Sequence, residues 1–145
     1  MDNARYRKLK KWKYQLVTPY TVPVGIGDYD IDTGYVKLSP GGLLTVSAFY
    51  AWDGPSGPTI DTADFMRGSL VHDALYQLIR MEKLPWRYRE YADLLLKKHC
   101  LEDGMCSFRA TYVYLAVRCF GAAAARPGTE PPAKTFCFPP GKTAS

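Results

Sequence analysis

One short run of the sequence has residue types suited to acid–base chemistry. His72, Asp73 and Tyr76 fall within a stretch whose apolar residues recur at helical spacing. Positions three and four apart share a helix face, so Ser69, His72 and Tyr76 would line up. Asp73 would point about 100° away from them, following the helical period. One turn would then offer an imidazole and a carboxylate to different partners. The alternative is that His72 is a hydrogen-bonded residue of the core.

A second acid, Asp93, lies in the middle of the next apolar segment. A short link containing Pro85 joins the two segments, so antiparallel helices would set Asp93 against His72. A carboxylate that accepts from one imidazole nitrogen fixes the tautomer and makes the other nitrogen a better base. Two ion pairs within the second helix compete with this arrangement, because Arg89 and Lys97 each lie four residues from Asp93.

The elements that would position these residues are strands followed by helices. Apolar residues alternate with polar ones, or are β-branched and aromatic, in the first third of the chain. Strands are predicted over 14–17, 20–24, 35–38 and 43–51. Helices are predicted from Asp61 or Thr62 to Met81, over 87–100 and from about 106 to 124. The loop between the two groups holds two glycines and two prolines in residues 52–59.

Charge and proline content mark the two ends of the chain. The net charge is +5, and residues 1–13 account for all of it with six basic side chains and one acid. Five prolines fall in the last 20 residues. We therefore expect a basic arm over 1–13 outside the packed core, a single domain over 14–125 and an extended tail over 126–145. The expected fold is α+β: a small N-terminal antiparallel β layer, then a three-helix core, with extended termini.

The sequence does not support a membrane-spanning segment, a secretory signal or a zinc site. The longest apolar stretch, 110–125, is interrupted by Arg118 and is shorter than the roughly 20 residues of a membrane span. The basic start of the chain does not lead into an apolar signal region. The cysteines lack the paired spacing of zinc ligands, and we expect reduced thiols. They are Cys100, Cys106, Cys119 and Cys137.

The His-Asp-x-x-Tyr run over 72–76 resembles the helix of phospholipase A2 enzymes. The loop of sequence Asp-Gly-Pro-Ser-Gly-Pro over 53–58 and the later Ala92-Asp93 are similar to two further parts of that family. The resemblance implies a phospholipase-A2-like helical core in which His72 is the general base and Asp93 orients it. It also implies Ca²⁺ as a cofactor, held by residues of the loop and the helix. These metal ligands would be Asp73, Asp53, Gly54 and Gly57.

The third predicted helix is similar to the Ala-x-x-Tyr and Val-Arg-x-x-Gly elements of the bacterial and fungal branch. This implies that Tyr112 and Arg118 support the site together with Tyr76. Ser69 and Leu75 stand where the family normally has cysteines.

The run from about 12 to 125 resembles more closely a domain family of unknown function that is common in tailed bacteriophages and prophages. The matching residues are Asp53, Ser56, Pro58, His72, Asp73, Leu75, Tyr76, Ala92, Asp93, Val117, Arg118 and Gly121. This resemblance implies a phage source and a location in the virion.

These observations favour a small virion component, such as a tail, baseplate or connector protein, with a phospholipase-A2-like core. The alternative is a calcium-dependent hydrolase that acts on phospholipid esters of the host envelope. Other phage structural proteins are the partners we expect first. An anionic membrane surface is the second, because the basic arm would be attracted to it. Nucleic acid comes third, since the sequence shows no helix-turn-helix or other nucleic-acid recognition motif.

Overall fold

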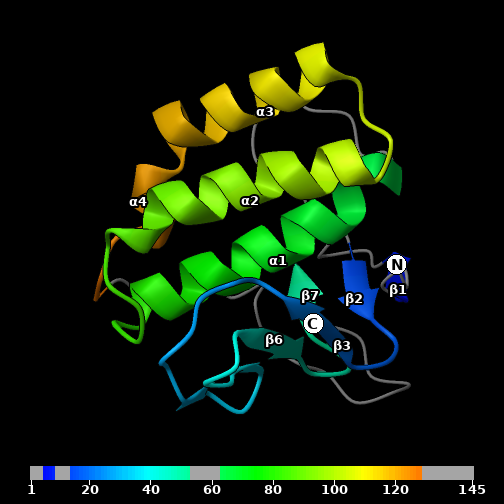
Figure 1. The fold of residues 1–145 in the computed structure, drawn as a ribbon. Helices are drawn as coiled ribbons and strands as arrows, with labels where there is room; N and C mark the ends of the chain where they lie inside the picture. Colours follow the sequence, from blue (N-terminus) through cyan, green and yellow to red (C-terminus); the bar gives the residue numbers. More distant parts are fainter. Residues whose placement is uncertain (1–4, 9–13, 53–62, 129–145) are drawn as a thin grey trace. The chain divides into compact units, whose positions relative to one another are not determined.

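The computed structural model describes residues 5–8, 14–52 and 63–128. These fall into two compact units, and the described residues up to 52 belong to the first and those from 63 onward to the second. The described residues form a mixed α+β fold, with two antiparallel sheets in the first unit and four helices in the second (Figure 1). The predicted α+β class is confirmed, whereas a single domain over 14–125 stays a prediction.

The larger sheet has its strands in the order β3-β6-β5-β4. They are β3 (Tyr20–Pro23), β4 (Ile31–Asp32), β5 (Val36–Leu38) and β6 (Leu43–Val46). Val22 lies opposite Leu44, which lies opposite Leu38, and all three side chains are buried. On the other face the hydroxyl oxygens of Thr21 and Thr45 lie 3.0 Å apart. This alternation is the period of two from which the strands were predicted.

The smaller sheet includes a strand from the N-terminal segment that the sequence analysis did not predict. Its strands, in the order β1-β2-β7, are β1 (Tyr6–Lys8), β2 (Tyr14–Leu16) and β7 (Ala51–Trp52). The ring of Tyr6 packs edge-on against Tyr14 and Trp52, with centroids 5.4 and 6.0 Å apart. The strand β1 was not predicted, yet Tyr6 is 39% exposed, so the prediction that residues 1–13 lie outside the packed core stays a prediction. Residues 1–4 and 9–13 of that arm, and the tail beyond 128, lie outside the described residues.

The second unit consists of helices. They are α1 (Ala63–Arg80), α2 (Tyr88–Glu102), α3 (Ser107–Phe120) and α4 (Ala122–Ala125). In Figure 1 the first three lie side by side and run in alternate directions. The first two helices begin and end within two residues of their predicted limits. The third is interrupted at Gly121, so its predicted last turn is the separate helix α4. Among the described residues, no helix has the length and apolar character that a membrane crossing requires.

A glycine sets the close packing of α1 on α2. A Cβ added to Gly68 would lie 3.0 Å from Cδ1 of Leu96 and 3.2 Å from Sγ of Cys100. The core cluster beside this contact is formed by Phe65, Leu96, Cys100, Met105, Ala110 and Val113. Of the residues in α3, only Ala110 and Val113 are buried. The α1–α2 pair is thus the firm frame of this unit, and α3 is held against it by a smaller contact.

Candidate functional site

The middle of α1 places three polar side chains on one buried face. Ser69, His72 and Tyr76 are almost fully buried, at the spacing that a helix brings together. The rings of His72 and Tyr76 lie 4.0 Å apart between their centroids. Asp73 is partly exposed, and its Oδ1 lies 3.9 Å from Nδ1 of His72. The two nitrogens of the imidazole therefore have different neighbours.

Asp93 of α2 faces this group from the adjacent helix. Its side chain is 0% exposed, and its Oδ1 lies 2.7 Å from Nε2 of His72. The same oxygen accepts a hydrogen bond from the Tyr76 hydroxyl at 2.6 Å. The predicted contact between His72 and Asp93 is confirmed. The competing prediction, in which Asp93 pairs with Arg89 or Lys97 within its own helix, is wrong.

The third partner of Asp93 comes from α3. Arg118 donates from Nη1 to Oδ2 of Asp93 at 2.9 Å. Both oxygens of the buried carboxylate are therefore engaged, one by His72 and Tyr76 and the other by the guanidinium. An ionised carboxylate is costly to bury unless it is paired and hydrogen-bonded. Here two neighbouring helices supply the partners that keep Asp93 charged.

A second arginine, Arg89 of α2, fastens the end of α3 to the same group. Its Nη2 donates to the carbonyl oxygens of Val117 and Arg118 at 2.9 Å each. Its Nε donates to the hydroxyl oxygen of Tyr76 at 3.2 Å. A cation at the C-terminal end of a helix stabilises the last carbonyls. Sequence reasoning considered Arg89 only as a rival partner of Asp93, because helix ends from elsewhere in the chain leave no local pattern.

Gly121, directly after α3, makes room for Tyr76. A Cβ at this position would lie 2.7 Å from the Tyr76 hydroxyl oxygen and 3.2 Å from Cε2 of its ring. The backbone angles of Gly121, φ −81° and ψ −13°, are open to other residues. The same Cβ would lie 2.5 Å from the backbone oxygen of Val117, so glycine is required here by the space that Val117 and Tyr76 occupy and not by the backbone angles.

A pocket of about 70 Å³ opens beside His72. Its polar lining residues all come from α1, whereas α2, α3 and α4 contribute apolar ones. The lining residues are Phe65, Ser69, His72, Asp73, Tyr76, Leu96, Val113, Ala116, Val117, Phe120, Gly121 and Ala124. Because one water needs about 10–15 Å³ on this scale, the pocket has room for several waters or a short apolar group.

The surroundings of His72, Asp93 and Tyr76 shift the pKa of each side chain. Burial lowers the pKa of His72, but the carboxylates of Asp73 and Asp93 raise it by more, so the net shift is upward. Burial raises the pKa of Asp93, and its bonds to His72, Tyr76 and Arg118 overcome this and lower it. Burial and Asp93 together raise the pKa of Tyr76, which stays a neutral donor. An ionised carboxylate only accepts, so Nε2 of neutral His72 carries the proton and Nδ1 is the basic nitrogen.

The predicted calcium ligands are only partly described. Asp53, Gly54 and Gly57 lie outside the described residues. Asp73 is described: it lines the pocket, and 30% of its side chain is exposed. In the ranges that the structure describes, no three His, Cys, Asp or Glu residues gather in a way that could hold a metal ion. Asp73 provides one oxygen ligand of the kind that Ca²⁺ prefers, and the rest of the site stays a prediction.

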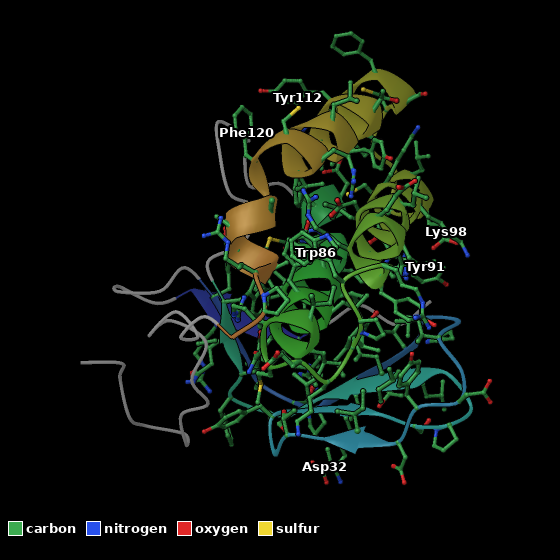
Figure 2. All side chains as sticks on the ribbon, turned by 90° about the vertical axis from the view of Figure 1, so that its left-hand side faces the viewer. Asp32, Trp86, Tyr91, Lys98, Tyr112 and Phe120 are labelled. Atoms are coloured by element: carbon green, nitrogen blue, oxygen red, sulfur yellow. The ribbon has the colours of Figure 1, made fainter. Side chains whose placement is uncertain are left out.

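The predicted supporting residues are not all at the site. Tyr76 and Arg118 belong to the group around Asp93, whereas Tyr112 is 45% exposed and points outward from α3 (Figure 2). Phe120 also projects from α3 and is 80% exposed, yet it lines the pocket (Figure 2). Sequence reasoning missed the apolar lining, because its residues come from separate helices that meet only in the fold.

Comparisons with models of protein families, with curated proteins and with solved structures give no match to this chain.

Proposed function

We propose that this chain is a hydrolase that cleaves an ester with an apolar acyl group, and that its substrate is a phospholipid. One observation carries the proposal. His72 is bound through Nε2 by buried Asp93 at 2.7 Å, and its ring lines a pocket whose other residues are mostly apolar. An imidazole oriented by a carboxylate is the arrangement that general-base catalysis needs. Apolar lining suits the hydrocarbon part of a lipid.

In the proposed reaction, neutral His72 takes a proton at Nδ1 from a water molecule that attacks the ester carbonyl carbon. The charge of Asp93 then stabilises the imidazolium, while Tyr76 and Arg118 hold the carboxylate in place. The proton passes from His72 to the leaving alcohol as the carbon–oxygen bond of the ester breaks. The products are a fatty acid and a lysophospholipid. A positioned general base of this kind contributes about 10²–10⁴ to the rate.

The proposal includes Ca²⁺ as a cofactor. Asp73 would hold the ion together with Asp53, Gly54 and Gly57 of the loop before α1. A bound cation supplies positive charge to the oxyanion that develops on the ester carbonyl. Asp73 is suited to this role, since its side chain is partly exposed, lies next to His72 and lines the pocket.

The arrangement of α1 and α2 supports a phospholipase-A2-like core as part of this proposal. The two helices run in opposite directions, with His72 and Asp73 on one and Asp93 on the other (Figure 1). Their close approach at Gly68 lets a short side chain such as Asp93 reach the imidazole directly.

A second candidate function, a small component of a bacteriophage virion, is supported by the outer side of α3. Three large side chains that share one face of this helix are exposed, Phe108, Tyr112 and Leu115. Contiguous exposed apolar residues are typical of surfaces that contact another protein or a membrane. The two roles are compatible, because a particle component could act on lipid at the host envelope. Mass spectrometry of purified particles tests this candidate, and a chain absent from them would contradict it.

The hydrolase proposal is tested by fatty-acid release from phosphatidylglycerol vesicles, with Ca²⁺ and with chelator. His72→Gln should lower the rate by about 10²–10⁴, because the amide can still bond to Asp93 but cannot act as a base. Asp73→Asn should raise the Ca²⁺ concentration needed for half-maximal rate, since the charged oxygen is the better ligand. His99→Gln is the matched control, because this second histidine does not line the pocket.

We expect the His99→Gln protein to keep the wild-type rate at a temperature where it is folded. A wild-type protein that releases no fatty acid in either condition would sink the proposal. So would a His72→Gln protein as active as the wild type.

A further inference from the structure

A row of side chains on α3 connects the outer face of this helix with the pocket. Residues four apart are separated by slightly more than one helical turn, so each step also rotates by about 40° around the axis. The residues at this spacing are Phe108, Tyr112, Ala116 and Phe120. Phe108 and Tyr112 are 86% and 45% exposed, whereas Ala116 and Phe120 line the pocket. The row therefore winds from solvent to the rim of the pocket.

The exposed part of this row carries large apolar side chains. Leu115 shares a face with Phe108 and is 54% exposed, and Phe120 is 80% exposed although it lines the pocket. Tyr112 and Phe120 both project outward from α3 (Figure 2). Contiguous exposed apolar side chains are typical of a surface that a partner covers. A partner on this surface would lie directly against the opening of the pocket.

The charge of α3 and α4 indicates what kind of partner fits. Residues 104–128 contain three arginines and no acidic residue. Two of them, Arg109 and Arg118, pair with carboxylates of α1 and α2, while Arg126 follows α4 and is exposed. Apolar rings bordered by basic residues are the composition of helices that lie in the headgroup region of a bilayer. Anionic headgroups would meet no like charge from this segment.

We propose that this row on α3 is a docking surface for a bilayer of anionic phospholipid, into which Phe108, Tyr112 and Leu115 insert. The role of the surface in delivering substrate to the pocket rests on the proposed hydrolase function. The binding itself does not, because it needs no turnover.

A bilayer suits this surface better than a second protein chain. A protein seated on Phe120 would cover the rim of the pocket and keep a substrate out. A bilayer instead presents phospholipid at that rim, and an acyl chain would pass along Tyr112 and Ala116 without being surrounded by water. Apolar and aromatic side chains are favoured at the boundary between headgroups and acyl chains. The surface and the pocket would thus contact the same lipid.

The test is sedimentation with phosphatidylglycerol vesicles at high salt, where attraction between the basic arm and the lipid is largely screened. Replacing Phe108 and Leu115 together by glutamine should weaken binding by about tenfold or more, because either side chain loses a favourable transfer out of water. The matched control replaces Leu94 and Leu101 of α2 by glutamine. These side chains are 46% and 41% exposed and do not line the pocket, so binding should stay at the wild-type level.

Both double variants should keep the wild-type unfolding midpoint, since the replaced side chains are exposed. If the α3 double variant does not fold, Phe108→Gln alone repeats the comparison at the most exposed of these positions. Equal binding by the α3 and α2 variants would overturn the inference, and so would a wild type that does not sediment with the vesicles. Self-association of the wild type without lipid, abolished in the α3 variant, would assign the face to a second copy and overturn it as well.

The outcome is separable from that of the proposed function. A wild type that releases no fatty acid, but whose vesicle binding depends on Phe108 and Leu115, contradicts the hydrolase and supports this inference. An α3 double variant that binds vesicles and releases fatty acid as the wild type does contradicts this inference and leaves the hydrolase proposal intact.

Discussion

The chain has two histidines, and their surroundings move their pKa values in opposite directions. His72 faces two carboxylates, which raise its pKa. His99 of α2 is buried, and burial together with the charge of Arg67 lowers its pKa from 6.5 to about 4. Within the described ranges, Nδ1 of His99 has no hydrogen-bond partner. At the scale of single residues, the same side chain is thus a candidate base at one position and a neutral core residue at the other.

This difference predicts an acid sensitivity that belongs to His99. The unfolded chain binds a proton below 6.5 and the folded chain only below about 4, so stability is full above pH 6.5 and falls as pH drops from 6.5 to 4. The shift corresponds to about 3 kcal/mol of unfolding free energy. Urea unfolding between pH 4 and 7.5 measures it. In His99→Leu this slope should disappear.

His72 and Asp93 change stability outside the range of pH 4 to 6.5, so their contributions can be distinguished from that of His99. His72 has a raised pKa, so its contribution is present below 6.5 and is lost as pH rises through its folded value. Asp93 has a lowered pKa, and its contribution is lost only as pH falls below 3.8. A His99→Leu protein that kept the wild-type slope between pH 6.5 and 4 would refute the assignment.

At the scale of elements, the ends of helices decide whether the site forms. α3 ends at Phe120, Arg89 caps its last carbonyls, and Gly121 turns the chain away at the point where Tyr76 needs space. A side chain at Gly121 would therefore act on the site through Tyr76, without touching His72 or Asp93.

Gly121→Ala should destabilise the protein by about 1–3 kcal/mol, because the added methyl group would clash with the backbone oxygen of Val117 and with the Tyr76 hydroxyl, and would strain the hydrogen bond of Tyr76 to buried Asp93. Thermal unfolding measures the cost, and the ring signals of His72 report the disturbance at the site. Gly41→Ala is the matched control, since nothing lies within 4 Å of its added Cβ. Equal unfolding midpoints for the two variants would contradict the steric role of Gly121.

Much of the arrangement of helices and strands could be predicted from the sequence. The limits of α1 and α2 followed from apolar residues at helical spacing, and the short link between them set Asp93 against His72. The strand β1 was missed, because Tyr6 is an apolar residue among basic ones and shows no alternation. Tyr112 was expected at the site, but the crossing of α3 on its neighbours turns it outward. Roles that depend on contacts between distant helices, such as that of Arg89, have no local pattern to find.

At the scale of the whole molecule, the basic residues are unevenly distributed. Residues 1–13 carry the entire net charge of +5, and the rest of the chain has equal numbers of acids and bases. Each basic residue near an anionic bilayer contributes about 1 kcal/mol of attraction. If lipid is the substrate, this segment would raise the local concentration of the chain at the membrane.

Replacing Lys10, Lys11 and Lys13 together by glutamine should weaken binding to phosphatidylglycerol vesicles by roughly 100-fold, from about 3 kcal/mol of lost attraction. Sedimentation with vesicles at low and high salt measures it, and high salt should remove most of the difference. The control replaces three exposed lysines elsewhere, Lys37, Lys83 and Lys98. Equal losses in the two triple variants would show that total charge, and not its position, governs binding.

The light packing of α3 has a consequence for how the site persists over time. Segments of a folded protein open separately, with free energies from near zero to that of global unfolding, and lightly packed ones open most often. α3 buries only Ala110 and Val113, yet it carries Arg118 and part of the pocket lining. Each local opening of α3 would leave α1 and α2 folded, while Asp93 would lose its hydrogen bond from the Arg118 guanidinium. The group around Asp93 would then be complete only while α3 is closed, and amide exchange along α3 measures how often this helix opens.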